Sequence, residues 1–153
     1  MPRYKSPNGT GRVGRDKKKK ALQTDEYKEN IEILAQRGVT PEDIEMIYNK
    51  CQERPQTKLA RHTLASKLVE LLEYFNKRNE GLNKDDIGYI SKDDSIEMIM
   101  RNPRIVTSSI TNNIIAKCQV ITEKRKSVRD ANAIIKCNPG VFRKSIKTIE
   151  KGR

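Results

Sequence analysis

Two stretches of the chain repeat one pattern around an asparagine–proline pair, and this repetition limits the fold more than any other feature. The first stretch is MIMRNPRIVTSSI at 98–110, and the second is IIKCNPGVFRKSI at 134–146. They match at five pairs of positions: Ile99 and Ile135, Asn102 and Asn138, Pro103 and Pro139, Ser109 and Ser145, and Ile110 and Ile146. Because proline disfavours helical dihedrals in the residue before it, each pair predicts a helix that stops and turns.

The residues after each proline indicate a buried corner and a second helix. Asparagine suits such a corner, since its side chain can satisfy local backbone groups. Apolar pairs follow at Ile105-Val106 and Val141-Phe142, and we expect them to be buried. Ser108 or Ser109 can cap the next helix. Its expected apolar stripe is Ile110, Ile114, Cys118 and Ile121. Each copy therefore predicts two helices joined by a fixed corner, called here an elbow.

A second internal sequence repeat predicts where the helical units begin. GVTPEDIEMI at 38–47 resembles GLNKDDIGYI at 81–90, and KSVRDANAII at 126–135 is a weaker third copy. In each, a capping residue and an acidic first turn indicate the start of a helix. Self-similarity at this spacing is typical of stacked helical units. We therefore predict an all-α fold of two to three short stacked helical repeats, similar to an α-solenoid.

The first 23 residues differ in composition from the rest of the chain. They combine proline and glycine with the run Lys17, Lys18, Lys19 and Lys20, and they lack an apolar period. This composition predicts a flexible basic arm over 1–23, followed by one α-helical repeat domain over 24–153. GTGRVG at 9–14 has the glycine spacing of a dinucleotide-binding loop, but no strand is expected before it, so we assign it to the arm.

Positive charge is unevenly distributed along the chain. The formal net charge is +12, yet residues 31–100 contain more acidic than basic residues. Residues 101–153 hold thirteen Lys and Arg against three acidic residues, Glu123, Asp130 and Glu150. Most cations of this segment are therefore expected to lack a carboxylate partner. Such a surplus favours a polyanionic partner, and nucleic acid is the commonest one.

The candidate nucleic-acid-binding residues are the basic side chains around the two elbows, together with the lysine run of the arm. Stacked units would bring the elbow residues into a row, which suits contacts to a phosphate backbone. No zinc finger, basic zipper or aromatic RNA-recognition pattern is visible, so base-specific recognition is not predicted. The elbow residues are Arg101, Arg104, Lys117, Lys124, Arg125, Lys126, Arg129, Lys136, Arg143, Lys144 and Lys147.

The elbow pattern resembles the repeat of the mitochondrial transcription termination factor (mTERF) family. The resemblance rests on a helix ending in NP, a following apolar pair, an SI dipeptide that opens a longer helix, and GLNKDDI at the start of a unit. It extends best over 81–150 and more faintly over 38–75. The resemblance implies a curved helical solenoid whose basic concave face holds double-stranded DNA or, in some members, structured RNA.

Other chemistry has little support in the sequence. Three separated cysteines and the single His62 do not form a zinc pattern, and no nucleophile–base set indicates an enzyme, so no cofactor is expected. The acidic pairs Asp85-Asp86 and Asp93-Asp94 raise the possibility of a metal site, but we interpret both as helix-start residues. We therefore predict a non-enzymatic nucleic-acid-binding protein involved in transcription or ribonucleoprotein assembly.

A protein-interaction module is the alternative, because helical repeats also bind proteins. No apolar run approaches the ~20 residues that cross a bilayer, so no membrane association is expected. The segment Met1 to Lys20 has no apolar stretch typical of a secretion signal. We expect a soluble, non-secreted protein of the cytoplasm, associated with the nucleoid, or a mitochondrial one as the family resemblance implies.

Overall fold

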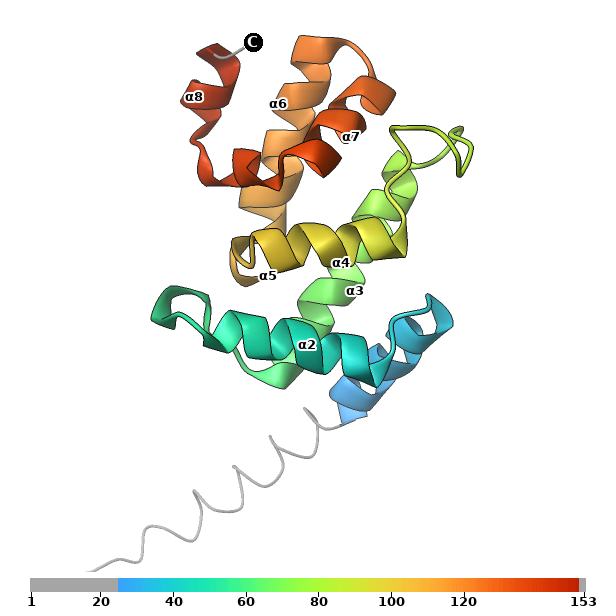
Figure 1. Cartoon of the computed structure of the whole chain (residues 1–153), viewed down its shortest axis with the longest axis vertical. Coiled ribbons are helices and arrows are strands. Elements are labelled where there is room, and N and C mark those ends of the chain that lie inside the picture. Colours follow the sequence, from blue (N-terminus) through green and yellow to red (C-terminus); the bar gives the residue numbers. More distant parts are fainter. Residues whose placement is uncertain (1–24, 152–153) are drawn as a thin grey trace, which may run out of the picture.

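The computed structural model describes residues 25–151 of the chain, and all regular structure in that range is helical (Figure 1). The predicted all-α fold is confirmed. In chain order, the elements are a helix at 25–36, α2 (Pro41–Gln52), the 3₁₀ turn η1 (Pro55–Thr57), α3 (Arg61–Arg78), α4 (Lys92–Arg101), α5 (Arg104–Thr107), the π-helical segment η2 (Ile110–Ile115), α6 (Ala116–Arg125), α7 (Val128–Cys137), the 3₁₀ turn η3 (Pro139–Arg143) and α8 (Ile146–Lys151).

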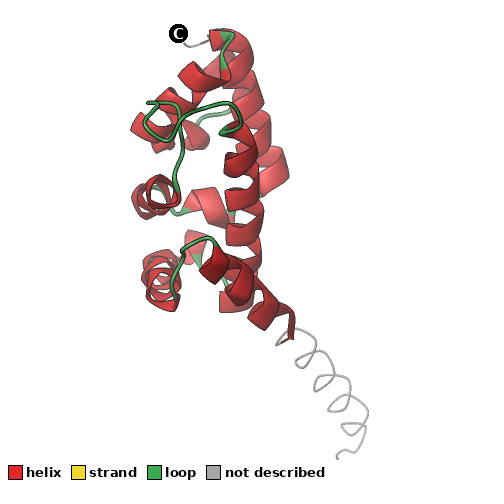
Figure 2. Ribbon diagram, turned by 90° about the vertical axis from the view of Figure 1, so that its right-hand side faces the viewer, coloured by secondary structure: helices red, strands yellow, loops and turns green. Residues whose placement is uncertain are grey.

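These elements group into three units of one design, in which a first helix, a short helical elbow and a second helix succeed one another. The units are α2, η1 and α3, then α4, α5 and the joined η2 and α6, and finally α7, η3 and α8. The first helices α2, α4 and α7 contact one another in sequence and form one side of the stack, while α3 and α6 run along the other side (Figure 2). The predicted array of stacked helical repeats is therefore present.

The same capping signal starts the first helix of every unit. In each, a side-chain hydroxyl accepts a hydrogen bond from the backbone N–H three residues later, which satisfies a donor that the helix leaves unpaired. The capping pairs are Thr40 and Asp43, Ser91 and Asp94, and Ser127 and Asp130. Ser91 and Ser127 are as far apart in sequence as Pro103 and Pro139, so the repeat extends from the cap to the end of the elbow.

The predicted helix start in GLNKDDIGYI is wrong, because residues 82–90 form a loop of turns. Asn79 anchors this loop: its side chain exchanges two 2.7 Å hydrogen bonds with the backbone of Ile90. The carboxylate of Asp86 accepts a further bond from the Gly88 backbone N–H at 2.8 Å. Side-chain bonds of this kind offer the backbone an alternative to helical pairing. The first helix of the unit therefore begins only after the loop.

The two acidic pairs consequently have different places in the structure. Asp93-Asp94 lies in the first turn of α4, as the sequence predicts, and the carboxylate of Asp94 completes a capping box with Ser91. Asp85-Asp86 lies in the loop 82–90 instead, so its assignment as a helix-start pair is wrong.

One continuous apolar core lies between the two sides of the stack. The longest helix, α3, contributes a row of buried apolar side chains, and both apolar pairs of the elbows are buried as expected. The buried α3 residues include Leu64, Leu68, Leu71, Leu72 and Phe75. Burial of the elbow pairs fixes the angle between the two helices of the second and third units.

A single arginine connects all three units at the back of this core. The guanidinium of Arg78, in α3, donates 2.7 Å hydrogen bonds to Thr122 of α6 and to the fully buried Asn132 of α7. It also contacts Tyr74 through a 3.2 Å hydrogen bond to the phenol. Burial raises the pKa of Tyr74 to about 12, so this phenol stays neutral. Arg78 thereby stabilises the packing of the three units against one another, and we do not assign it to a binding surface.

Candidate nucleic-acid interface

The two asparagine–proline elbows share one backbone geometry. Asn102 has φ −141° and ψ 85°, and Asn138 has φ −139° and ψ 71°. In both cases the asparagine N–H donates a 2.9 Å hydrogen bond to a carbonyl four residues earlier, and the helix ends there. The next residues then turn into a short helical segment whose apolar pair is buried. The sequence repeat therefore corresponds to a repeated corner in space.

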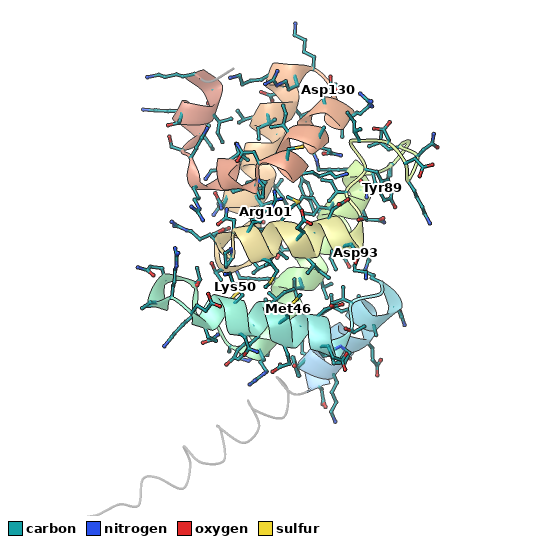
Figure 3. All side chains as sticks on the ribbon, viewed as in Figure 1. Met46, Lys50, Tyr89, Asp93, Arg101 and Asp130 are labelled. Carbon is teal, nitrogen blue, oxygen red and sulfur yellow. The ribbon has the colours of Figure 1, made fainter. Side chains whose placement is uncertain are left out.

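The three elbows lie along one edge of the stack, which we call the elbow edge (η1, α5 and η3). A groove of about 570 Å³ opens there, between the C-terminal ends of α2 and α4 and the third elbow. Figure 3 shows Lys50 and Arg101 toward this edge, whereas Tyr89 and Asp93 lie toward the opposite one. The groove is lined by Lys50, Glu53, Arg54, Gln56, Thr57, Arg101, Asn102, Pro103, Arg104 and Arg143.

Positive charge dominates this lining. Five of the ten lining residues are basic and only Glu53 is acidic. The C-terminal ends of α2 and α4 add about half a negative charge each, because helix dipoles point that way. Subtracting these and the glutamate from the five cations leaves an excess of about three positive charges in the groove. The groove is therefore suited to an anion with several charges.

Few of these basic side chains are paired with carboxylates of the protein. Lys50 lies 3.3 Å from Glu53, and Arg101 lies 3.5 Å from Glu97, but both glutamates are largely exposed. Exposed pairs of this kind contribute little and exchange readily with other anions. The other three basic residues of the groove form no ion pair with any residue between 25 and 151; they are Arg54, Arg104 and Arg143.

Two of the predicted lysines hold the units together. Lys117, in α6, donates a 2.9 Å hydrogen bond to the Phe142 carbonyl of the third elbow, and Lys124 donates at 2.7 Å to the Ile149 carbonyl of α8. Burial lowers the pKa of Lys117, and the guanidinium of Arg104 lowers it further. Lys117 does not line the groove, and its ammonium group already has a backbone partner.

Arg129 and Lys136 lie at the opposite edge, which we call the loop edge (the loop 82–90 and the α7 residues that contact it). Arg129 lies 2.8 Å from Asp86, and Lys136 lies 3.3 Å from Asp94. Lys136 also donates to the carbonyls of Ile87 and Tyr89. The expectation that the basic residues of 101–153 lack carboxylate partners does not hold for these two residues, because chain folding brings in acidic residues from the segment before them.

The remaining predicted residues lie away from the groove or outside the described residues. Arg125 and Lys126 end α6, where Lys126 adopts a left-handed conformation with φ 56°. Lys144 and Lys147 are exposed at and after the third elbow, and Lys144 lines a separate depression of about 230 Å³ beside α8. Lys17 to Lys20 lie outside residues 25–151.

Sequence reasoning missed two basic residues of the groove, Lys50 and Arg54. Both belong to the first unit, inside a segment whose overall charge is negative. Averaging charge over that segment hid them. A local signal was available, since Arg54 precedes Pro55 at the first elbow as Arg101 precedes the Asn102-Pro103 pair.

Other kinds of site have little support among residues 25–151. That range contains no group of three or more His, Cys, Asp or Glu side chains placed to hold a metal ion. Burial raises the pKa of Cys51 to about 11 and that of Cys118 to about 12, which keeps both thiols protonated and unreactive. Within the same range, no helix has the length and apolar character needed to cross a bilayer.

Comparison with known proteins finds no relative of this chain. No family model matches it, and no curated protein and no solved structure matches it either. The resemblance to the mTERF repeat stays a prediction from the sequence. Inference about function therefore depends on the position, charge and neighbours of the groove residues.

Proposed function

We propose that the protein binds duplex nucleic acid, DNA or structured RNA, through phosphate contacts along the elbow edge. The observation that carries the proposal is the groove in which basic residues from all three units meet with one acidic residue. A polyanion that spans the elbows would contact each unit in turn. Binding would release condensed counterions from the backbone, which supplies much of the affinity of such complexes.

The chemistry of the lining favours phosphate over bases. Four of the five cations are arginines, whose planar guanidinium groups bind phosphate oxygens with two parallel hydrogen bonds. None of the ten lining residues is aromatic, so the groove offers bases no stacking surface. Phosphate contacts fix the position of a protein on nucleic acid without reading the sequence. We therefore expect weak sequence preference and a non-enzymatic role in transcription or ribonucleoprotein assembly.

Protein binding is the second candidate, and a different surface favours it. A depression of about 400 Å³ lies between the helix at 25–36 and α2, with an apolar lining that includes Tyr27, Ile31 and Ile44. Met46, on α2, is also 42% exposed. These apolar groups lie on α2 and on the helix that precedes the first unit, so protein binding there is compatible with nucleic-acid binding at the elbow edge.

A salt titration tests the proposed function. The affinity of the full chain for duplex DNA, duplex RNA and single strands is measured by fluorescence anisotropy between about 50 and 200 mM salt. We expect duplexes to bind best and log K to fall linearly with log salt, by about 0.9 for each phosphate neutralised. Arg104→Ala should lower that slope by about 1, because it removes one phosphate contact.

Lys77→Ala is the matched control for this titration. Lys77 is exposed near the end of α3 and does not line the groove, so its loss removes a positive charge elsewhere. We expect the salt slope to stay at the wild-type value. Equal slopes for Arg104→Ala and wild type, or no binding by the wild-type chain, would contradict the proposal.

A further inference from the structure

The two elbow asparagines have the same backbone geometry but opposite surroundings. Asn102 is 1% exposed at the groove, whereas Asn138 is exposed at the end of the stack. Local capping therefore does not explain why Asn102 is buried, because Asn138 ends its helix equally well from an exposed position. The difference lies in the neighbours of the two elbows. The second elbow has the third elbow beside it, whereas no further elbow follows the third among residues 25–151.

The side chain of Asn102 bridges from the second elbow to the third. Its Nδ2 donates a 3.0 Å hydrogen bond to the carbonyl of Pro139, where η3 begins. Its Oδ1 accepts a bond from Nε of Arg143, where η3 ends, at 3.5 Å. The first bond is the stronger, since the second is at the outer limit of hydrogen bonding. One amide thus contacts both ends of the third elbow.

We infer that Asn102 is a positioning residue for the groove: it ties the third elbow to the second and so holds Arg143 beside Arg101 and Arg104. Pro139 and Asn102 are both buried, so the hydrogen bond between them is shielded from water. The Asn102 amide donates to the Pro139 carbonyl from the neighbouring unit, in addition to the bonding of η3 itself, and so helps to fix where η3 lies. The position of Arg143 depends on η3, because Arg143 is its last residue.

This inference rests on the proposed function, since it concerns how one phosphate-binding arginine is held. Arg143 comes from a different unit than Arg101 and Arg104, so backbone geometry within one unit does not set their separation. A link between units is required, and the Asn102 amide is such a link at the groove itself. The side chain that ends one helix therefore also aligns the cations of the neighbouring unit.

A double-mutant cycle tests the positioning role. Affinity for a duplex is measured for wild type, Asn102→Ala, Arg143→Ala and the double variant. Losing one phosphate contact should weaken binding about eight-fold at 0.1 M salt, because the binding constant varies with salt concentration to the power of about −0.9 for each contact. We expect each single variant to lose about that factor and about 1 from the salt slope, and the double variant to lose no more. Full multiplication of the two losses would overturn the inference.

Two further variants serve as controls for this test. Asn138→Ala removes the equivalent asparagine of the third unit, and we expect its affinity and salt slope to match the wild type. Asn102→Ser keeps a polar side chain in place, but it is too short to reach the third elbow. It should reproduce the loss even if Asn102→Ala does not fold. Wild-type affinity in Asn102→Ser would overturn the inference.

Hydrogen exchange without nucleic acid separates this inference from the proposed function. The amides of Val141 and Lys144 donate 3.1 Å hydrogen bonds to the carbonyls of Asn138 and Val141, at the two ends of η3, so they report on whether the third elbow is fixed. We expect Asn102→Ala or Asn102→Ser to speed exchange there and to leave the amides of α2 unchanged. Unchanged exchange at both amides would contradict the inference that Asn102 fixes the third elbow. A wild-type chain that binds no duplex would overturn the proposed function. The exchange result would still show whether Asn102 fixes the third elbow.

Discussion

The elbow edge and the loop edge both carry basic residues, but these residues have different partners. At the elbow edge, Arg104 and Arg143 line a groove and form no ion pair with any residue between 25 and 151. At the loop edge, Arg129 and Lys136 bind carboxylates and backbone carbonyls of the loop 82–90 and of α4. The comparison teaches that the number of cations in a segment does not locate a binding surface; the position of the carboxylates does.

The cause lies in the loop 82–90, which brings acidic residues to the start of α7. Gly88 allows close approach, because a Cβ atom there would lie 2.5 Å from the backbone oxygen of Arg129. The same packing puts Asp86 within reach of the Arg129 guanidinium. No acidic loop of this kind covers the elbow edge, where Glu53 is the only acidic lining residue between 25 and 151.

The largest expected effect is at the elbow edge. Replacing Arg101, Arg104 and Arg143 together by alanine should weaken duplex binding about 500-fold at 0.1 M salt and lower the salt slope by about 2.7, since three phosphate contacts are lost. Fluorescence anisotropy over a salt series measures both quantities. The control removes the same charge elsewhere, with Lys28, Lys77 and Lys84 replaced by alanine. A comparable loss in the control would mean that net charge, rather than the groove, determines binding.

A glycine substitution separates the two edges by their packing. Gly88→Ala should lower the free energy of unfolding by about 1 to 3 kcal/mol, because the new Cβ would overlap the Arg129 backbone and force the loop away from α7. Gly140→Ala, at the elbow edge, is the comparison. Its Cβ would meet only the Asn138 side chain at 3.2 Å, which can move. Urea unfolding measures both, and equal costs would contradict close packing at the loop edge.

Removing the loop-edge cations should affect stability and leave binding unchanged. Lys136→Ala leaves the carbonyls of Ile87 and Tyr89 without their ammonium donor, which should lower the free energy of unfolding by about 1 to 2 kcal/mol. Arg129→Ala should cost less, about 0 to 1 kcal/mol, since its pair with Asp86 is partly exposed. We expect the salt slope for duplex binding to remain at the wild-type value. A salt slope lowered by about 1 in either variant would mean that the replaced residue does contact the nucleic acid.

The smallest expected effect is an acid sensitivity confined to the loop edge. The Gly88 backbone hydrogen bond lowers the pKa of Asp86, and the Arg129 guanidinium adds to it against the opposing effect of burial. Burial raises the pKa of Asp94, but hydrogen bonds from Ser91 and the Lys136 ammonium outweigh it and lower the pKa overall. Both carboxylates therefore stabilise the fold above their ordinary pKa of 3.8, and this contribution is lost as the pH falls below that value.

Unfolding at about pH 5 and about pH 3 measures this contribution, because the two values bracket the ordinary carboxyl pKa. Asp86→Asn should reduce the difference between them, since asparagine does not titrate. Hydrogen exchange should show the loop 82–90 opening in acid before the elbow edge does. Opening of both edges together would remove the distinction between them.

Local signals in the sequence were enough to predict the helices and the elbows. Thr40 with an acidic first turn, the apolar stripe from Ile110 to Ile121, and the repeated Asn102 and Asn138 corners each depend on residues close in sequence. The loop 82–90 was mispredicted as a helix start because its order depends on contacts that span the loop or reach α7, such as the Asn79 side chain with Ile90 and Gly88 with Arg129, rather than on adjacent residues.

The candidate site was predictable only in part, for the same physical reason. Arg101, Arg104 and Arg143 were expected beside the elbows, and the structure brings them together in one groove. The pairing of Arg129 and Lys136 required knowledge of which acidic residues fold against α7. Lys50 and Arg54 were missed because the acidic residues around them in sequence do not face the groove, apart from Glu53.

The contacts of Arg78 have a consequence for how the array unfolds. In an ideal helical repeat protein, each unit touches only its neighbours, so terminal units fray and unfolding spreads along the array. Here one guanidinium from the first unit holds a side chain of the second and one of the third at the same time. Detaching the last unit therefore disturbs the first, and the three units should melt in a single cooperative transition.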